Sequence, residues 1–161
     1  MSPEPTIHLM CGLVAAGKTT LARQLARDLP AVRLSRDEWM LRLYGGRYDD
    51  PTYIARLQPC TEVLWDVATG IVGAGSSVIL DWNFWNRELR SQARHRADAC
   101  GAALVVHWLD VPVDLAAQRA KARLNDHPPD AHDIDEGAVR QFATIFEPPT
   151  TDESVAIDHH R

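Results

Sequence analysis

Eight residues near the N-terminus, Gly12-Leu13-Val14-Ala15-Ala16-Gly17-Lys18-Thr19, constrain the fold of this chain more than any other feature. They match the pattern G-x-x-x-x-G-K-[ST] and follow an apolar run at residues 7–11 that is typical of a buried strand. Leu21, Leu25 and Leu29 then recur every fourth residue, as on one face of a helix. The pattern predicts a strand, a glycine-rich turn and a helix, an arrangement that binds phosphate groups.

The chemistry of this turn predicts a nucleotide site that includes a magnesium ion. Its backbone N–H groups converge on one point, and the following helix adds the positive end of its dipole. We expect Lys18 to reach the β- and γ-phosphates and the Thr19 hydroxyl to bind Mg²⁺. The residues expected to contact ATP are Gly12, Ala15, Ala16, Gly17, Lys18, Thr19 and Thr20.

Apolar runs and helix-like segments alternate along the rest of the chain. Further strands are expected at residues 31–34, 77–81, 102–109 and 155–157, and helices at 19–28, 37–44, 52–72, 87–100, 114–124 and 135–146. We expect the helix at 52–72 to break near Pro59. Nearly continuous apolar strands separated by helices predict an α/β fold with a parallel sheet covered on both faces. Residues 1–161 are expected to form a single domain.

Composition and charge exclude several classes of protein. The chain has 161 residues, 45% of them hydrophobic, and a formal net charge of −5 at pH 7. This composition is typical of a globular domain, and the charge provides no overall attraction to nucleic acid or to anionic lipid. Cys11, Cys60 and Cys100 are widely spaced, which suits reduced thiols better than disulfides or a zinc site. Without a basic leader or a membrane-length apolar run, we expect a soluble cytoplasmic protein.

The phosphate-binding turn alone does not separate a kinase from a switch or a motor. GTPases that select guanine usually carry Asn-Lys-x-Asp, and this chain has no Asn-Lys dipeptide. A D-x-x-G sequence at residues 98–101 lies at the end of an expected helix instead of after a strand. Motor ATPases need a longer chain. These exclusions favour a small kinase with a phosphate-binding loop, an acceptor site and a mobile lid that carries arginines.

The order of motifs resembles that of the P-loop kinases related to the 5′-kinase domain of polynucleotide kinase, chloramphenicol phosphotransferase and the zeta toxins. The resemblance covers residues 7–123. Besides the phosphate-binding loop it rests on Ser35-Arg36-Asp37-Glu38, on Val78-Ile79-Leu80-Asp81-Trp82-Asn83, and on Asp110-Val111-Pro112 followed by Arg119 and Arg123. It implies a three-layer fold with a five-stranded parallel sheet and an arginine-bearing lid. ATP would occupy the loop, and a hydroxyl acceptor would lie beyond the carboxyl ends of the strands.

Two aspartates are the candidate general base and metal ligand. Asp37 follows the second expected strand, where its carboxylate could orient an acceptor hydroxyl and take its proton, the role of this aspartate in the resembled kinases. The alternative is a helix N-cap, a role that Ser35 fills equally well. Asp81 ends an apolar strand, a common place for a carboxylate near Mg²⁺. We favour Asp81 over Asp110, which fits a turn or a cap.

Arg119 and Arg123 are the candidate lid residues. They lie four positions apart and therefore on one face of a helix. Guanidinium groups on a closing lid neutralise the negative charge that spreads over the transferred phosphoryl group. Arginines on an Ala-rich helix can also be merely solvated, and the family resemblance favours the lid role.

The acceptor side departs from the polynucleotide kinases. Their basic residue three positions after the catalytic aspartate corresponds here to Met40, although Arg42 is near. Asn83 and Asn86 could bind hydroxyls. Five aromatic residues could stack an acceptor or could equally pack in the core: Trp39, Tyr44, Tyr48, Trp82 and Trp85. Four histidines show no metal-ligand spacing, and we expect the last two in a disordered end: His127, His132, His159 and His160.

Together these features predict an ATP- and Mg²⁺-dependent phosphotransferase. Its acceptor would be a hydroxyl of a small molecule such as a sugar, a nucleoside or an antibiotic. One alternative is a polynucleotide or nucleoside 5′-kinase, which would need a local basic groove built from Arg42, Arg47, Arg87 and Arg90. The other alternative is a nucleotide-binding regulator that hydrolyses ATP slowly.

Overall fold

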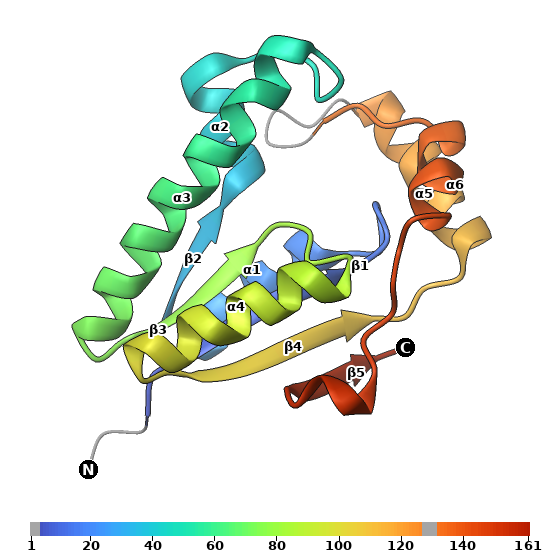
Figure 1. Ribbon diagram of the computed structural model, residues 1–161. Coiled ribbons are helices and arrows are strands. Elements are labelled where there is room, and N and C mark those ends of the chain that lie inside the picture. The colour runs from blue at the N-terminus through green and yellow to red at the C-terminus, as the bar shows by residue number, and fades with distance from the viewer. Residues whose placement is uncertain (1–3, 127–131) are drawn as a thin grey trace.

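Five parallel strands form the sheet of this protein, whose computed structural model describes residues 4–126 and 132–161 (Figure 1). The strands are β1 (Thr6–Gly12), β2 (Ala31–Ser35), β3 (Ser77–Asp81), β4 (Ala103–Leu109) and β5 (Ala156–His160). Their order in the sheet is β2-β3-β1-β4-β5. The expected α/β fold with a five-stranded parallel sheet is confirmed.

Helices connect the strands and cover both faces of the sheet. They are α1 (Lys18–Asp28), α2 (Arg36–Tyr44), α3 (Pro51–Gly73), α4 (Arg87–Cys100), α5 (Val113–Asp126), α6 (Glu136–Ala143) and the short 3₁₀ helix η1 (Thr151–Glu153). Helices α3 and α4 pack on one face, and α1 packs on the other (Figure 1). Among the described helices, none is both long enough and apolar enough to cross a membrane.

The central strand β1 contributes side chains to the hydrophobic cores on both faces of the sheet. Because side chains of a strand alternate between the two faces, Ile7, Leu9 and Cys11 join the core under α3 and α4. Met10 points the other way and packs against Ala22 of α1. All of these side chains are buried. Burial on both faces explains why this strand is apolar at successive positions, and it fixes the carboxyl end of β1 where the glycine-rich turn begins.

Two helices differ from the prediction by more than one or two residues at their ends or in continuity. Helix α3 is continuous and contains Pro59, so the expected break is wrong. Its apolar face is buried on both sides of the proline, with Tyr53 before it and Cys60, Leu64 and Trp65 after it. This packing keeps the helix intact although the proline removes one backbone hydrogen bond. Helix α6 is shorter than the expected 135–146.

The C-terminal residues form β5, so the expectation of a disordered end at His159 and His160 is wrong. The physical reason is the free edge of β4, whose backbone N–H and C=O groups need partners. Strand β5 pairs along this edge in parallel. Directly after β4, the Asp110 N–H donates to the carbonyl oxygen of His160, the last residue of β5, at 2.8 Å.

A buried arginine anchors the segment that leads into β5. Arg90 of α4 donates to both carboxylate oxygens of Glu153 at 2.7 Å. Its remaining nitrogen donates to the Phe84 carbonyl at 3.0 Å and to the Glu147 carbonyl at 2.9 Å. The Arg90 and Glu153 side chains are only 1% and 5% exposed. The guanidinium therefore ties the C-terminal segment to α4 and to the loop after β3.

Candidate active site

The glycine-rich turn lies between β1 and α1, and the structure explains why both of its glycines are needed. A side chain at Gly12 would place its Cβ 2.9 Å from the Leu109 carbonyl oxygen of β4, so the close approach of the strands requires glycine. Gly17 has a φ of 102°, in the left-handed region that L side chains rarely adopt. Its conformation starts α1 with the backbone N–H groups of the turn at the helix N-terminus, where anions bind.

Lys18 folds back over this turn. Its ammonium group donates to the carbonyl oxygens of Gly12 at 3.0 Å and of Leu13 at 2.7 Å. Removal from water lowers the pKa of Lys18 to about 8, although the Asp81 carboxylate opposes the shift. The two hydrogen bonds hold the ammonium group of this half-buried side chain over the turn.

One cavity of about 590 Å³ collects nearly all of the expected site residues. Gly12 alone of the predicted set is not among its lining residues. The predicted residues that line it are Ala15, Ala16, Gly17, Lys18, Thr19, Thr20, Asp37, Asp81, Arg119 and Arg123. They come from the turn after β1, the start of α2, the end of β3 and helix α5. The fold thus places residues that are distant in the sequence around a single space, beyond the carboxyl ends of the strands.

The two residues expected to hold Mg²⁺ are in direct contact. The Thr19 hydroxyl donates to Asp81 Oδ1 at 3.3 Å. The Asp81 side chain is 3% exposed, and its burial raises the pKa of the carboxyl despite the neighbouring Arg33 guanidinium. A hydroxyl and a carboxylate are hard oxygen donors of the kind that Mg²⁺ prefers, so this pair fits the ion. Asp110, the alternative, follows β4 and accepts a hydrogen bond from His159 at 3.0 Å instead.

Sequence reasoning missed Arg33, which holds the Asp81 carboxylate. Its Nε and Nη2 atoms donate to Asp81 Oδ2 at 2.8 and 2.6 Å. The same Nη2 donates to Glu38 at 2.8 Å, and Glu38 also accepts from Arg23 at 3.1 Å. Strands β2 and β3 pair in parallel with Ser35 opposite Asp81, which brings Arg33 within reach. A lone arginine inside the otherwise apolar strand was the signal that could have found it.

Asp37 lies in the first turn of α2. The cap of this helix is Ser35, whose hydroxyl accepts from the Glu38 N–H at 3.4 Å, so Asp37 does not serve as the N-cap. Its carboxylate is among the groups that line the cavity. Asp37 therefore faces the cavity from the start of α2.

Both candidate lid arginines reach the cavity from α5. Arg119 Nη1 donates to the carbonyl oxygen of Ala16 at 3.3 Å, which joins α5 directly to the glycine-rich turn. Arg123 lies one helical turn further and also lines the cavity. The two guanidinium groups therefore face the same space as Lys18.

Two residues that line the cavity carry buried polar atoms without partners in the described part of the chain. Arg36 Nε and Asn83 Oδ1 are buried and have no hydrogen-bond partner among the described residues, and both residues line the cavity. Buried donors and acceptors are costly to leave unpaired, so these atoms indicate a place for a polar ligand. His132 also lines this space, and His127 lies outside the described residues.

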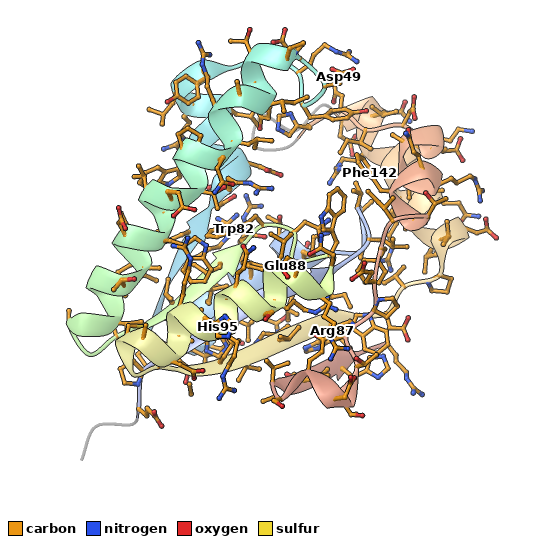
Figure 2. All side chains as sticks on the ribbon, in the orientation of Figure 1. Asp49, Trp82, Arg87, Glu88, His95 and Phe142 are labelled. Carbon is orange, nitrogen blue, oxygen red and sulfur yellow. The ribbon has the colours of Figure 1, made fainter. Side chains whose placement is uncertain are left out.

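Only one of the candidate stacking aromatics lines the described cavity. It is Trp82, which follows β3, lies between α3 and α4 (Figure 2), and packs edge-on against Trp65 with centroids 6.1 Å apart. Trp39 packs beside the core, and Trp85 packs on Phe142 of α6 at 5.3 Å. Core packing therefore accounts for most of the aromatic cluster.

The strand order and the glycine-rich turn between β1 and α1 give this chain a P-loop α/β fold like that of small kinases. A model of the AAA domain family AAA_33 matches residues 7–149, and the chain belongs to this family.

Solved structures agree on this fold. A candidate kinase from Chloroflexus aurantiacus has a TM-score of 0.76 at 21% identity, over 98% of this chain and 88% of that one. A sugar kinase from Janibacter sp. HTCC2649 has a TM-score of 0.65 at 20% identity, over 98% and 86%. A chain of the Pnkp1/Rnl/Hen1 RNA repair complex has a TM-score of 0.71 at 24% identity. This protein covers 43% of that longer chain, with 87% of its own length aligned. No curated protein sequence matches the chain.

Proposed function

We propose that this protein is an ATP- and Mg²⁺-dependent kinase that phosphorylates a hydroxyl of a small molecule. One observation carries the proposal. A single cavity is lined by the phosphate-binding turn, the Thr19–Asp81 pair, the Asp37 carboxylate and the arginines of α5. A nucleotide switch needs the first two of these features, whereas phosphoryl transfer to an alcohol also uses a base and cations around the transferred group.

Each group has a defined task in this reaction. The backbone N–H groups of residues 12–17 and the Lys18 ammonium bind the phosphates, and Lys18 exchanges its carbonyl partners for phosphate oxygens. Thr19 and Asp81 would hold Mg²⁺, which would offset the negative charge of the phosphates. Arg33 keeps the Asp81 carboxylate oriented through its two hydrogen bonds.

The chemical step then needs only a base and charge neutralisation. The acceptor oxygen attacks the γ-phosphorus, and the bond to the β–γ bridging oxygen breaks to release ADP. Asp37 receives the proton of the acceptor hydroxyl, so the carboxylate becomes neutral as the new ester forms. Arg119 and Arg123 stabilise the charge on the transferred group and help to exclude water.

Charge pairing supports a small acceptor over a nucleic-acid strand. Of the arginines that a basic groove would need, Arg47 pairs with Asp49, Arg87 with Asp152, and Arg90 with Glu153. These ion pairs cancel the positive charge that would track a phosphate backbone. The likeness to a chain of an RNA repair complex keeps the polynucleotide kinase as the second candidate.

A labelling screen tests the proposal. The protein is incubated with ATP radiolabelled in its γ-phosphate and with pools of sugars, sugar acids, nucleosides, antibiotics and 5′-hydroxyl oligonucleotides. We expect transfer to a small molecule, and we expect Asp37→Asn to lower this transfer roughly a hundredfold or more while ATP affinity changes only a few-fold. The matched control is Asp66→Asn, an exposed carboxylate of α3 outside the cavity, which keeps full activity. Equal turnover by Asp37→Asn would overturn the assignment of the base.

A further inference from the structure

A second cluster of ligating side chains lies away from the active-site cavity, between strands β4 and β5. It consists of His107, Asp158 and His160, none of which lines that cavity. Each residue turns one donor atom toward the other two. His107 Nδ1 lies 3.2 Å from His160 Nε2 and 3.3 Å from Asp158 Oδ2, and His160 Nε2 lies 3.3 Å from the same Oδ2. Three donor atoms therefore form a nearly equilateral triangle.

The sheet itself brings these residues together. In the parallel pairing of β4 with β5, His107 stands opposite Asp158. His160 is two residues further along β5, so it projects from the same face as Asp158. His159, between them, projects from the opposite face and stacks on Trp108 with centroids 4.2 Å apart. The cluster is thus fixed by backbone register and does not depend on a flexible loop.

The size of the triangle matches a tetrahedral metal ion. Donors about 2.0–2.1 Å from a tetrahedral ion lie about 3.3–3.4 Å from one another. Neighbouring donors of an octahedral ion with bonds of about 2.1 Å lie only about 3.0 Å apart. The observed separations of 3.2, 3.3 and 3.3 Å agree better with the tetrahedral arrangement. Two imidazoles and one carboxylate are also the donor set that zinc takes, whereas Mg²⁺ prefers oxygen alone.

His8 supplies the support that metal-binding histidines usually have. Its Nδ1 atom lies 2.9 Å from Nε2 of His107, the ring nitrogen that faces away from the triangle. When Nε2 of His107 carries the proton and donates to His8, Nδ1 of His107 is left free to ligate. The His107 side chain is 4% exposed and cannot turn away, whereas the Asp158 and His160 side chains are 56% and 33% exposed. The site is rigid on one side and open to solvent on the other.

We propose that His107, Asp158 and His160 bind a divalent transition-metal ion of the zinc type, with water as the fourth ligand. The ion links the edge strand β5 to β4 and stabilises the C-terminal end of the sheet. This site shares no residue with the proposed Mg²⁺ site at Thr19 and Asp81, and it does not depend on the proposed kinase activity.

Calorimetric titration with Zn²⁺ tests the proposal on full-length protein purified without a polyhistidine tag, in buffer free of nucleotide and Mg²⁺. We expect one ion per chain. Asp158→Asn and His160→Ala should each weaken binding about tenfold or more, at least the loss that follows removal of a supporting hydrogen bond. Two matched controls, His159→Ala on the opposite face of β5 and His95→Ala on exposed α4 (Figure 2), should bind Zn²⁺ as the wild type does.

Two further readouts separate ligation from loose association. Co²⁺ in place of Zn²⁺ should give the intense visible absorption of a four-coordinate ion in the wild type and not in Asp158→Asn. Saturating Zn²⁺ should raise the thermal midpoint of the wild type and of His159→Ala, but not that of His160→Ala. Circular dichroism checks that each variant is folded. The proposal is overturned if the wild type binds Zn²⁺ no more tightly than the Asp158→Asn and His160→Ala variants, and the three atoms then only share a hydrogen-bonded proton.

Discussion

Removal of the Glu153 carboxylate should destabilise the protein severely, because it isolates the buried Arg90 charge. Arg90 is 1% exposed and loses two hydrogen bonds of 2.7 Å in Glu153→Ala. Its bonds to the Phe84 and Glu147 carbonyls persist, but neither carries a charge that balances the guanidinium. Breaking one partner of a buried pair costs about 3–5 kcal/mol, a large part of the roughly 5–15 kcal/mol that stabilise a typical domain.

Urea unfolding followed by circular dichroism measures this loss. The matched control is Asp152→Asn, because the neighbouring Asp152 also pairs with an arginine, Arg87, but both side chains are more than half exposed. We expect the control to unfold at nearly the wild-type urea concentration. A loss below about 1 kcal/mol in Glu153→Ala would refute the reasoning, since it would mean that water reaches and solvates Arg90.

The Arg90–Glu153 ion pair also makes the unfolding free energy depend on pH in the acid range. Burial alone would raise the pKa of Glu153, but the Arg90 guanidinium lowers it below its usual value. A carboxyl whose pKa is lower in the folded than in the unfolded state stabilises the fold above about pH 4.3 and loses this contribution as the pH falls through the folded pKa. The unfolding free energy of Glu153→Ala should therefore fall less steeply than that of the wild type below about pH 4.

Three further predictions concern the proposed kinase. Lys18→Ala should abolish calorimetric binding of MgATP and leave the circular dichroism spectrum unchanged, and undiminished affinity would contradict the role of the lysine. Arg123→Ala should lower kcat at least about tenfold with little change in the ATP affinity, and an unaltered kcat would remove it from the lid. Single-stranded oligonucleotides at about 0.15 M salt should bind no more tightly than about 10⁻⁴ to 10⁻⁶ M, and efficient labelling of their 5′-hydroxyls would favour the polynucleotide kinase.

Most of the fold was predictable because local patterns and tertiary packing agree. Buried strands, amphipathic helices and a glycine-rich turn follow one another along the chain, and each leaves a periodic trace in the sequence. Pro59 misled us because propensity describes an isolated helix, while burial of Tyr53 and Leu64 on either side holds α3 together. The C-terminal histidines misled us because only the unpaired edge of β4, which no local pattern reveals, makes them a strand.

The residues that line the cavity could be predicted where a local sequence pattern marks them. Residues of the phosphate-binding turn are adjacent in the sequence. Asp37 follows one predicted strand and Asp81 ends another, so the parallel sheet brings both to one edge. The contact of Arg33 with Asp81 was not predicted because it depends on the pairing of β2 with β3, which places the two residues side by side. Arg36 and Asn83 stand out only because each has a buried polar atom without a hydrogen-bond partner among the residues that the structure describes. Such burial arises only when the chain folds, so the sequence does not reveal it.

The strand order also explains how one sheet could hold the two ions of different chemistry that we propose. The oxygen donor Asp81 lies at the carboxyl end of β3, and Thr19 lies at the start of α1, after the turn that follows the neighbouring strand β1. The imidazole donors lie on β4 and β5, at the opposite edge from β2. Mg²⁺ binds nitrogen donors weakly, whereas a zinc-type ion binds them well, so each proposed ion would have its own donor set. All parallel strands have their carboxyl ends at the same edge of the sheet. The two proposed sites are therefore separated by the strands that carry them, β1 and β3 for one and β4 and β5 for the other.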